Sequence, residues 1–185
     1  KDRSSISLED KKITAFHEAG HALVAKKASK LNRVTKVSII PSTKGMGGFS
    51  LNLPPDKMYQ TKKDIITNIK VALGGRAAEE LVFGKDNITT GASSDLQKAT
   101  EMTISMIGSY GMDDEVGLIN YDVILNSNLN TDVSLMERTR DMLESLYGET
   151  KEILEVNRYY LDQMANMLLE KESLSEEEID KILAS

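Results

Sequence analysis

His17 and His21 are the only histidines of the chain, and they lie four residues apart in the stretch FHEAGH, residues 16–21. Residues four apart on a helix share one face, with their Cβ atoms about 5–6 Å apart. Two imidazoles placed in this way can each give one nitrogen ligand to a single zinc ion. Glu18 lies beside that face, where it can take a proton from a zinc-bound water as the water attacks a carbonyl. This His-Glu-x-x-His pattern predicts hydrolytic zinc chemistry.

The third zinc ligand has to be a carboxylate. A catalytic zinc ion needs three protein ligands and one water. The chain has no cysteine and both histidines are used, so Asp or Glu must complete the set unless another chain supplies a ligand. Glu79 and Glu80 on one predicted helix, and Asp95 in the first turn of another, are the candidates. Asp95 could instead only complement the dipole of its helix, so the residues themselves leave the choice open.

Gly20 lies between the histidines in a predicted helix, where glycine costs about 1 kcal/mol relative to alanine. Gly20 and the neighbouring Ala19 have almost no side chain. Another backbone or a substrate could therefore approach the helix closely at this point. Composition alone favours this interpretation no more than it favours an accident of packing.

The elements that must position these residues are mostly helical. Apolar residues at three- and four-residue spacing predict a helix over about 8–29, preceded by a polar lead-in over 1–7. Alternation of β-branched residues predicts a strand over 34–40, which Pro41 ends. The stretch KGMGGFSL, residues 44–51, predicts a turn and a second strand that its glycines loosen.

Further helices follow from the same spacing. They are predicted over about 58–73 and, after an interruption at Gly74-Gly75, over 76–83, then from about 93 to 107, and over 176–183. A C-terminal helical part over 134–183 contains one long helix, or a pair broken near Gly148. A short strand over 117–121 and a mobile loop over 122–133 precede it. The fold class is therefore mostly α with a small β-sheet (α+β), in a single domain over 1–185.

The bulk composition excludes several classes of function. The net charge of -6 and the acidic pI of about 5.1 argue against a nucleic-acid-binding surface. The lack of cysteine excludes disulfides and thiolate metal sites, and no apolar run reaches the ~20 residues that span a bilayer. Because the first residue is lysine and no leader pattern follows it, we expect a fragment or processed product, soluble as it stands.

The glycine-rich second strand also suggests how a polypeptide could bind. A site that binds polypeptides of many sequences should hold their backbone, and an added strand at a sheet edge does so through main-chain hydrogen bonds. We therefore expect Gly47, Gly48, Phe49 and Ser50 to line the cleft beside the histidines. The alternative is a plain turn between two strands.

Five stretches of the chain, in this order and spacing, resemble the peptidase domain of the FtsH-type membrane-anchored AAA+ zinc proteases. They are TAFHEAGHALV (14–24), VSIIP (37–41), LGGRAAEE (73–80), TGASSDL (90–96) and YGM (110–112). The resemblance covers nearly the whole chain. It implies a zinc peptidase domain built on the His-Glu-x-x-His helix, with long C-terminal helices.

The resemblance also assigns roles to residues. It implies that His17, His21 and Asp95 bind Zn²⁺, that Glu18 is the catalytic base, and that Glu79 supports the site through a histidine N–H. Such supporting partners orient a ligand and raise its basicity.

The resemblance further implies a homo-hexamer that hydrolyses unfolded or membrane-extracted polypeptides, which an upstream AAA+ ATPase module threads in. The chain has no G-x-x-x-x-G-K-[ST] phosphate loop, so ATP and Mg²⁺ would bind only in that module. The full-length protein would be membrane-anchored through segments absent here, with this domain facing the cytoplasm or an organelle interior. No nucleic-acid partner is expected.

Two segments depart from the family, and two other functions compete with proteolysis. Residues 42–45 replace an arginine-glycine turn, and residues 122–133 replace a more regular approach to the long helix. The first departure would affect substrate preference and the second subunit packing. A non-catalytic member that binds polypeptides or scaffolds a ring is disfavoured by the intact Glu18. A structural zinc site is disfavoured because it would need a fourth protein ligand.

Overall fold

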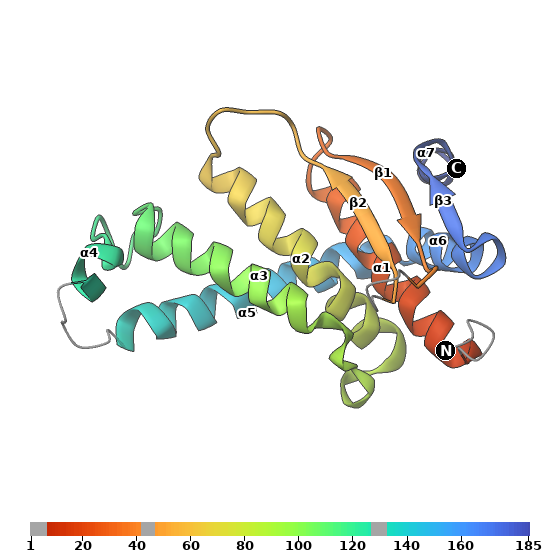
Figure 1. Ribbon diagram of the computed structural model, residues 1–185, viewed down its shortest axis with the longest axis horizontal. Helices are drawn as coiled ribbons and strands as arrows, with labels where there is room; N and C mark the ends of the chain where they lie inside the picture. The colour runs from red at the N-terminus through yellow and green to blue at the C-terminus, as the bar shows by residue number, and fades with distance from the viewer. Residues whose placement is uncertain (1–6, 42–46, 127–132) are drawn as a thin grey trace.

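Helices make up most of the molecule, and a small three-stranded sheet lies at one end (Figure 1). This computed structural model describes residues 7–41, 47–126 and 133–185. The helices are α1 (Leu8–Ala28), α2 (Lys62–Phe83), α3 (Ser93–Ile104), α4 (Tyr121–Asn126), α5 (Val133–Val156), α6 (Arg158–Lys171) and α7 (Glu176–Leu183). The short helical turns are η2 (Lys85–Asn87), η3 (Thr90–Ala92) and η4 (Ser105–Ser109), and the strands are β1 (Arg33–Ser38), β2 (Phe49–Leu53) and β3 (Ser173–Ser175). The predicted α+β fold class is confirmed.

Side-chain caps set the start of several helices. The backbone N–H of Asp10 donates to the Ser7 hydroxyl at the start of α1, at 3.0 Å. At the start of α2, Thr61 and Asp64 form a reciprocal capping box. Such caps each stabilise a helix by about 1 kcal/mol. The apolar spacing predicted that this helix begins near Met58. The cap at Thr61 explains why α2 begins at Lys62 instead.

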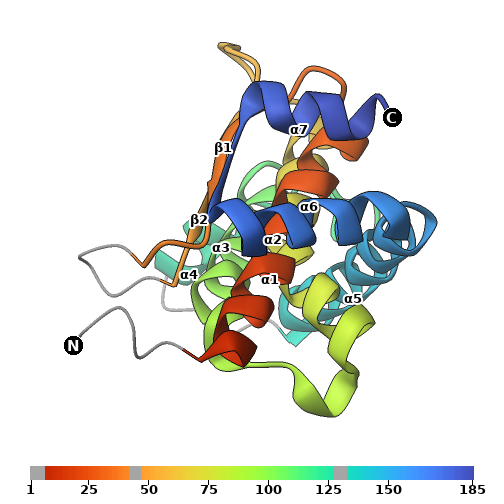
Figure 2. The ribbon, with the colours of Figure 1, turned by 90° about the vertical axis from the view of Figure 1, so that its right-hand side faces the viewer.

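Helix α1 is the central element and carries both histidines. Every residue from Ala15 to Ala25 is buried, because β1 and β2 cover one side of α1 and α2 and α6 cover others (Figure 2). Leu23 and Val24 of α1 share one apolar cluster with Leu161 and Leu168 of α6. The histidines are therefore held on a rigid, buried helix.

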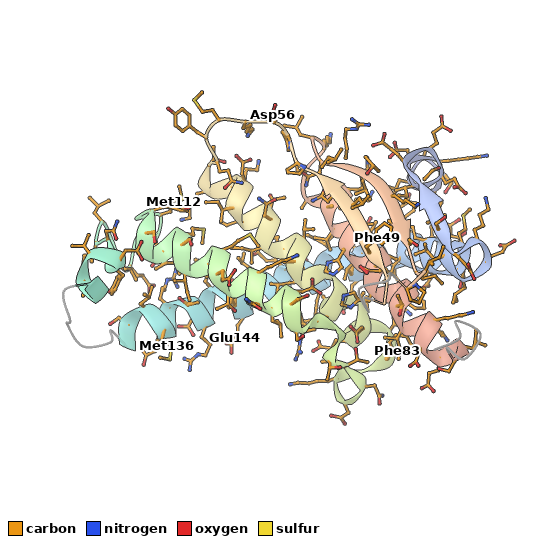
Figure 3. All side chains as sticks on the ribbon, viewed as in Figure 1. Phe49, Asp56, Phe83, Met112, Met136 and Glu144 are labelled. Atoms are coloured by element: carbon orange, nitrogen blue, oxygen red, sulfur yellow. The ribbon has the colours of Figure 1, made fainter. Side chains whose placement is uncertain are left out.

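A second apolar cluster attaches α3 to α2. Ile69 and Leu73 of α2 pack with Ala99 of α3, Met106 of η4 and Leu146 of α5. Side chains continue this cluster toward the end of the molecule where Met112 lies (Figure 3). This packing fixes where the first turn of α3 lies relative to α1.

The helix breaks differ from those predicted. Gly74 and Gly75 do not interrupt α2, and Gly148 lies inside α5. The long C-terminal helix breaks at Asn157, whose backbone leaves the helical region (φ -107°, ψ 25°). The Asn157 side-chain amide donates to the carbonyl of Ile153 at 2.8 Å, so this side chain competes for the helical acceptor.

The sheet and the α3–α5 connection also differ in detail. The sheet order is β2-β1-β3, and all pairs are antiparallel. Strand β3 was not predicted, because three residues are too few for a periodic signal. The predicted strand over 117–121 is wrong, because Gly117 adopts a turn conformation with φ 80° and Tyr121 begins α4. Of the predicted loop over 122–133, residues 122–126 are helical and residues 127–132 lie outside the described part. Among the described helices, none has the length and apolar character needed to cross a membrane.

Candidate metal centre

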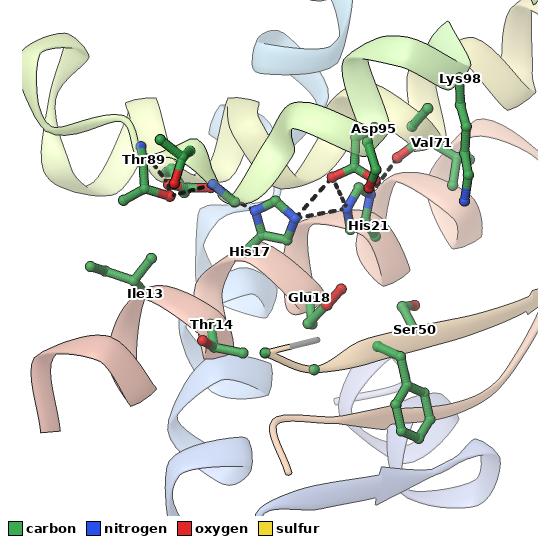
Figure 4. A pocket seen from close by; sticks show the side chains of 18 of the residues that line it. Ile13, Thr14, His17, Glu18, His21, Ser50, Val71, Thr89, Asp95 and Lys98 are labelled. Atoms are coloured by element: carbon green, nitrogen blue, oxygen red, sulfur yellow. Dashed lines mark hydrogen bonds and ion pairs between the residues drawn. The ribbon is translucent and has the colours of Figure 1, made fainter. Parts of the chain in front are cut away.

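The two histidines point their Nε2 atoms at one another from α1 (Figure 4). The Nε2 atoms of His17 and His21 lie 3.1 Å apart, and both side chains are buried. Two nitrogens bound to one tetrahedral zinc ion at about 2.0–2.1 Å would lie about 3.4 Å apart. The spacing of the pair therefore fits two ligands of one ion.

Asp95 brings the third atom to the same point. Its Oδ2 lies 3.1 Å from His17 Nε2 and 3.2 Å from His21 Nε2. The three atoms form a nearly equilateral triangle whose corners come from α1 and α3. Two imidazole nitrogens and one carboxylate oxygen suit Zn²⁺ and leave the fourth position open. The residues present therefore fit the metal that the sequence implies.

The three carboxylates that the sequence left open have different surroundings. Asp95 touches both Nε2 atoms, whereas Glu79 contacts the other nitrogen of His17. Glu80 faces away and pairs with Lys151 of α5 at 2.9 Å. Of these three, only Asp95 is placed to complete the ligand set.

Glu18 lies near the histidines but not at the point where His17, His21 and Asp95 meet. One of its carboxylate oxygens lies within 4.8 Å of a nitrogen of each histidine, so it could in principle bind the same ion. No hydrogen bond joins it to His17 or His21 in the described part of the chain, whereas Asp95 bonds to both. Glu18 therefore lies beside the other three side chains without a hydrogen bond to either histidine.

Hydrogen bonds to the Nδ1 atoms fix the orientation of both rings. The Nδ1–H of His17 donates to Glu79 at 2.6 Å, and that of His21 donates to the backbone carbonyl of Val71 at 2.7 Å. Glu79 is fully buried and accepts two further bonds, from the Thr89 backbone N–H at 3.0 Å and the Thr89 hydroxyl at 2.6 Å. These bonds direct both Nε2 lone pairs to the shared point. Neither Val71 nor Thr89 was predicted as part of the site, and a backbone acceptor such as that of Val71 leaves no signal in residue type.

Hydrogen bonds among His17, Asp95 and Glu79 shift the pKa values of all three groups. Burial lowers the pKa of His17, but hydrogen bonds to Asp95 and Glu79 outweigh burial and raise that pKa to about 10. Burial raises the pKa of Asp95, but hydrogen bonds from both histidines hold it well below its usual range. The pKa of Glu79 is likewise lowered, because the bonds from His17 and Thr89 outweigh burial. When no metal is bound, His17 therefore keeps a proton that a metal cation must displace.

Glu18 shows the opposite shift. Its burial raises the pKa of the carboxyl above the usual range, and the neighbouring histidines only partly counter the effect. A raised pKa brings a carboxylate closer to the value that suits proton transfer near neutral pH.

Glycines let the second helix reach the histidines. A Cβ on Gly20 would lie 2.4 Å from the Gly74 carbonyl oxygen and 2.6 Å from the Ala78 Cβ. A Cβ on Gly75 would lie 2.5 Å from His17 Nε2 and 2.6 Å from His21 Nε2. The backbone that approaches Gly20 is thus that of α2, and Gly75 lies directly against the two rings.

The predicted substrate strand lies beside the histidines. Gly47, Gly48, Phe49 and Ser50 line the same cleft of about 710 Å³ as His17, Glu18 and His21. Strand β2 pairs with β1 and is one of the two edge strands of the described sheet. The Cβ position of Gly48 is blocked by the Ser38 carbonyl oxygen at 2.6 Å, so this glycine lets β2 lie close to β1. Residues 42–46, which include the predicted turn and the departure at 42–45, lie outside the described part.

Comparisons with known proteins identify the family of the chain. The sequence profile of peptidase family M41 matches residues 4–182. The chain is 54% identical to the ATP-dependent zinc metalloprotease FtsH 1 of Alkaliphilus metalliredigens, with all of the chain aligned to 31% of that protein. It is 49% identical to FtsH of Lachnoclostridium phytofermentans (98% and 31% of the two chains) and 35% identical to FTSH 9 of Oryza sativa (92% and 22%). The chain thus spans less than a third of the length of these relatives.

Proposed function

Because the chain belongs to peptidase family M41, we propose that it is the proteolytic domain of an ATP-dependent zinc metalloprotease. It hydrolyses peptide bonds in unfolded or membrane-extracted polypeptides. The observation that carries the proposal is the convergence of His17 Nε2, His21 Nε2 and Asp95 Oδ2 within 3.1–3.2 Å of one another, with Glu18 beside them. Names such as that of the Alkaliphilus protein, a zinc metalloprotease, agree with it.

The chemistry follows from the roles of these side chains. A zinc ion held by His17, His21 and Asp95 would polarise the substrate carbonyl and acidify a coordinated water. Glu18 accepts one proton from the attacking water and passes it to the nitrogen of the leaving amine, so the peptide bond yields one carboxylic acid and one amine. The buried Glu79 holds His17 in the tautomer that presents Nε2.

The edge strand β2 holds the substrate. Its residues Phe49 and Ser50, together with Gly47 and Gly48, line the cleft, and one edge of β2 has no neighbouring strand in the described sheet. A substrate added there as an extra strand would be held by its main chain whatever its sequence. This binding mode suits a protease that receives many unfolded chains.

Partners and location are proposed on the same basis. In the full-length protein the domain works in a homo-hexamer, and an AAA+ module outside this chain binds ATP and Mg²⁺ and feeds in the substrate. Membrane contact occurs only through segments outside this chain, and the domain faces the cytoplasm or an organelle interior. All three relatives named above carry names that combine ATP dependence with zinc proteolysis. The alternative function is a non-catalytic member that binds polypeptides or scaffolds a ring.

Substitution of Glu18 separates these alternatives. Glu18→Gln should leave the zinc content unchanged and abolish cleavage of casein and short peptides, because the change removes the proton acceptor and no ligand. Glu9→Gln on the exposed start of the same helix is the matched control and should keep full activity. The measurements are zinc content and peptide hydrolysis with and without chelator. Turnover at the wild-type rate in Glu18→Gln, or no cleavage by the zinc-loaded wild type, would refute the proposal.

A further inference from the structure

The cleft extends beyond the histidines in two directions. One arm lies toward Ile13 and Thr14 of α1, and the other lies toward Lys98 of α3 (Figure 4). Side chains of β2, α2 and α3 line the second arm, which we call the Lys98 arm. We group under this name six of the residues that line the cleft, namely Ser50, Asn52, Asn68, Ala72, Lys98 and Met102.

Lys98 gives this arm its charge. It is the single Lys or Arg among the described residues that line the cleft, whereas the other charged lining residues are the carboxylates Asp10, Glu18, Glu79 and Asp95. Lys98 lies three residues after Asp95, and its side chain extends from α3 down the side of the cleft beyond Asp95, to the right of His21 (Figure 4). No ion pair or hydrogen bond joins Lys98 to another residue in the described segments. Its charge is therefore available to a ligand.

Polar atoms on the opposite wall also lack partners. Ser50 Oγ and Asn52 Oδ1 are buried and form no hydrogen bond within the described structure. The two residues are two apart on β2, so their side chains lie on the same face of the strand. Buried polar atoms normally have partners. A ligand in the Lys98 arm could supply them. The Ser50 hydroxyl can donate to a carboxylate, whereas Asn52 Oδ1 accepts and suits a main-chain N–H of the substrate.

The direction of β2 tells which part of a substrate enters this arm. Gly48 lies beside Glu18, since a Cβ on Gly48 would come within 3.3 Å of Glu18 Cγ, and Asn52 lies further along the strand. The described sheet is antiparallel throughout. A substrate that continues this antiparallel pattern runs against β2, so the residues that pass Asn52 precede those that pass Gly48. The Lys98 arm thus faces side chains about three or four residues before the cleaved bond.

We propose that the Lys98 arm is a substrate subsite that selects Asp or Glu on the N-terminal side of the cleaved bond, with Lys98 as the specificity-determining residue. The inference rests on the proposed function, because it places the substrate along β2. Coulomb attraction between Lys98 and the substrate carboxylate favours acidic side chains, and repulsion disfavours Lys and Arg.

Matched peptides test this subsite. Unstructured fluorogenic peptides would carry Glu, Gln or Lys at the third and fourth positions before a defined cleavage site, and kcat/KM would be measured with the zinc-loaded protein. We expect the Glu peptide to exceed the Lys peptide by about two- to fivefold, as for partly exposed charge pairs, and the ratio to fall as salt rises. Lys98→Met should bring the ratio near one, and Lys98→Glu should invert it.

Lys85→Glu is the control, because it makes the same charge change on an exposed residue that does not line the cleft. It should keep the wild-type ratio, and zinc content should be unchanged in all three variants. Equal ratios in wild type and Lys98→Glu, with cleavage intact, would overturn the subsite. A charge preference confined to the C-terminal side of the bond, located by mass spectrometry of the products, would also overturn it. Failure of the zinc-loaded wild type to cleave any peptide would instead overturn the proposed function, and the inference with it.

Discussion

Gly75→Ala should strongly weaken zinc binding at the candidate metal centre while leaving the fold in place. The added Cβ would lie 2.5 Å from both Cε1 and Nε2 of His17 and 2.6 Å from Nε2 of His21. Non-bonded carbon contacts are most favourable at about 3.5–4.0 Å, so the rings would have to retreat by roughly 1 Å. Zinc ligands tolerate departures of only about 0.2 Å. The required movement is therefore several times larger than the metal allows.

The two imidazole rings cannot move away from position 75 without losing hydrogen bonds. His17 is held from its other nitrogen by Glu79 at 2.6 Å, and His21 by the Val71 carbonyl at 2.7 Å. A shift of about 1 Å breaks these bonds, which by themselves are worth about 10–100-fold in metal affinity. We expect Gly75→Ala to lose at least this factor in zinc affinity. Overpacking costs about 1–3 kcal/mol and the gain in helix propensity returns about 1 kcal/mol, so the protein should still fold.

Two measurements and one matched control separate a metal defect from a folding defect. Zinc affinity is measured by competition with a chromogenic chelator, and stability by urea unfolding of the chelator-treated protein. Gly148→Ala makes the same change inside α5, where a Cβ meets nothing within 4 Å. It should stabilise the protein by about 1 kcal/mol and leave zinc affinity unchanged. Wild-type zinc affinity in Gly75→Ala would show that the two rings do not depend on this contact.

Two further predictions concern the ligand set. Asp95→Ala should abolish stoichiometric zinc binding, whereas Glu79→Ala should weaken zinc binding or activity by only about 10–100-fold, as metal analysis would show; the reverse order would mean that the two carboxylates have exchanged roles. Zinc uptake near pH 8 should release about one proton per ion, because the pKa of His17 in the absence of metal is raised to about 10 and its ligand form is unprotonated. Calorimetry in buffers of different ionisation enthalpy counts that proton, and zinc uptake without proton release would contradict the raised pKa of His17.

The part of the candidate site that lies within one helix could be predicted from the sequence. His17, Glu18 and His21 are fixed relative to one another by a single helix, so their spacing already predicts their geometry. Asp95 approaches the two histidines only through tertiary packing, because apolar contacts hold α3 against α2. The pattern of residues could not choose Asp95 over Glu80 because both lie on helices. What separates them is that Glu80 faces Lys151 and not the histidines.

The difference between local sequence pattern and tertiary contact also explains where the predicted helices and strands were wrong. The interruption predicted at Gly74-Gly75 followed from the low helix propensity of glycine, but tertiary packing outweighs that cost of about 1 kcal/mol per residue. The break at Asn157 depends on one side-chain bond to the Ile153 carbonyl, which leaves no periodic signal. Strand β3 forms because β1 offers Lys36, Val37 and Ser38 as partners, and a three-residue strand has no pattern of its own.

Three glycines that bind neither metal nor substrate shape the candidate metal centre. They are Gly20, Gly74 and Gly75. Gly20 and Gly74 each exclude a Cβ because the other's backbone occupies its place, at 2.4 Å and 2.9 Å from the respective carbonyl oxygens. This contact sets how closely α2 lies against α1. That distance in turn places the Val71 carbonyl and Glu79, both on α2, within hydrogen-bond reach of the two Nδ1 atoms. The fixed orientation of both imidazoles thus offsets the helix-propensity cost of the glycines. A larger residue at any of the three positions would displace the imidazole rings, although it would leave the types of the site residues unchanged.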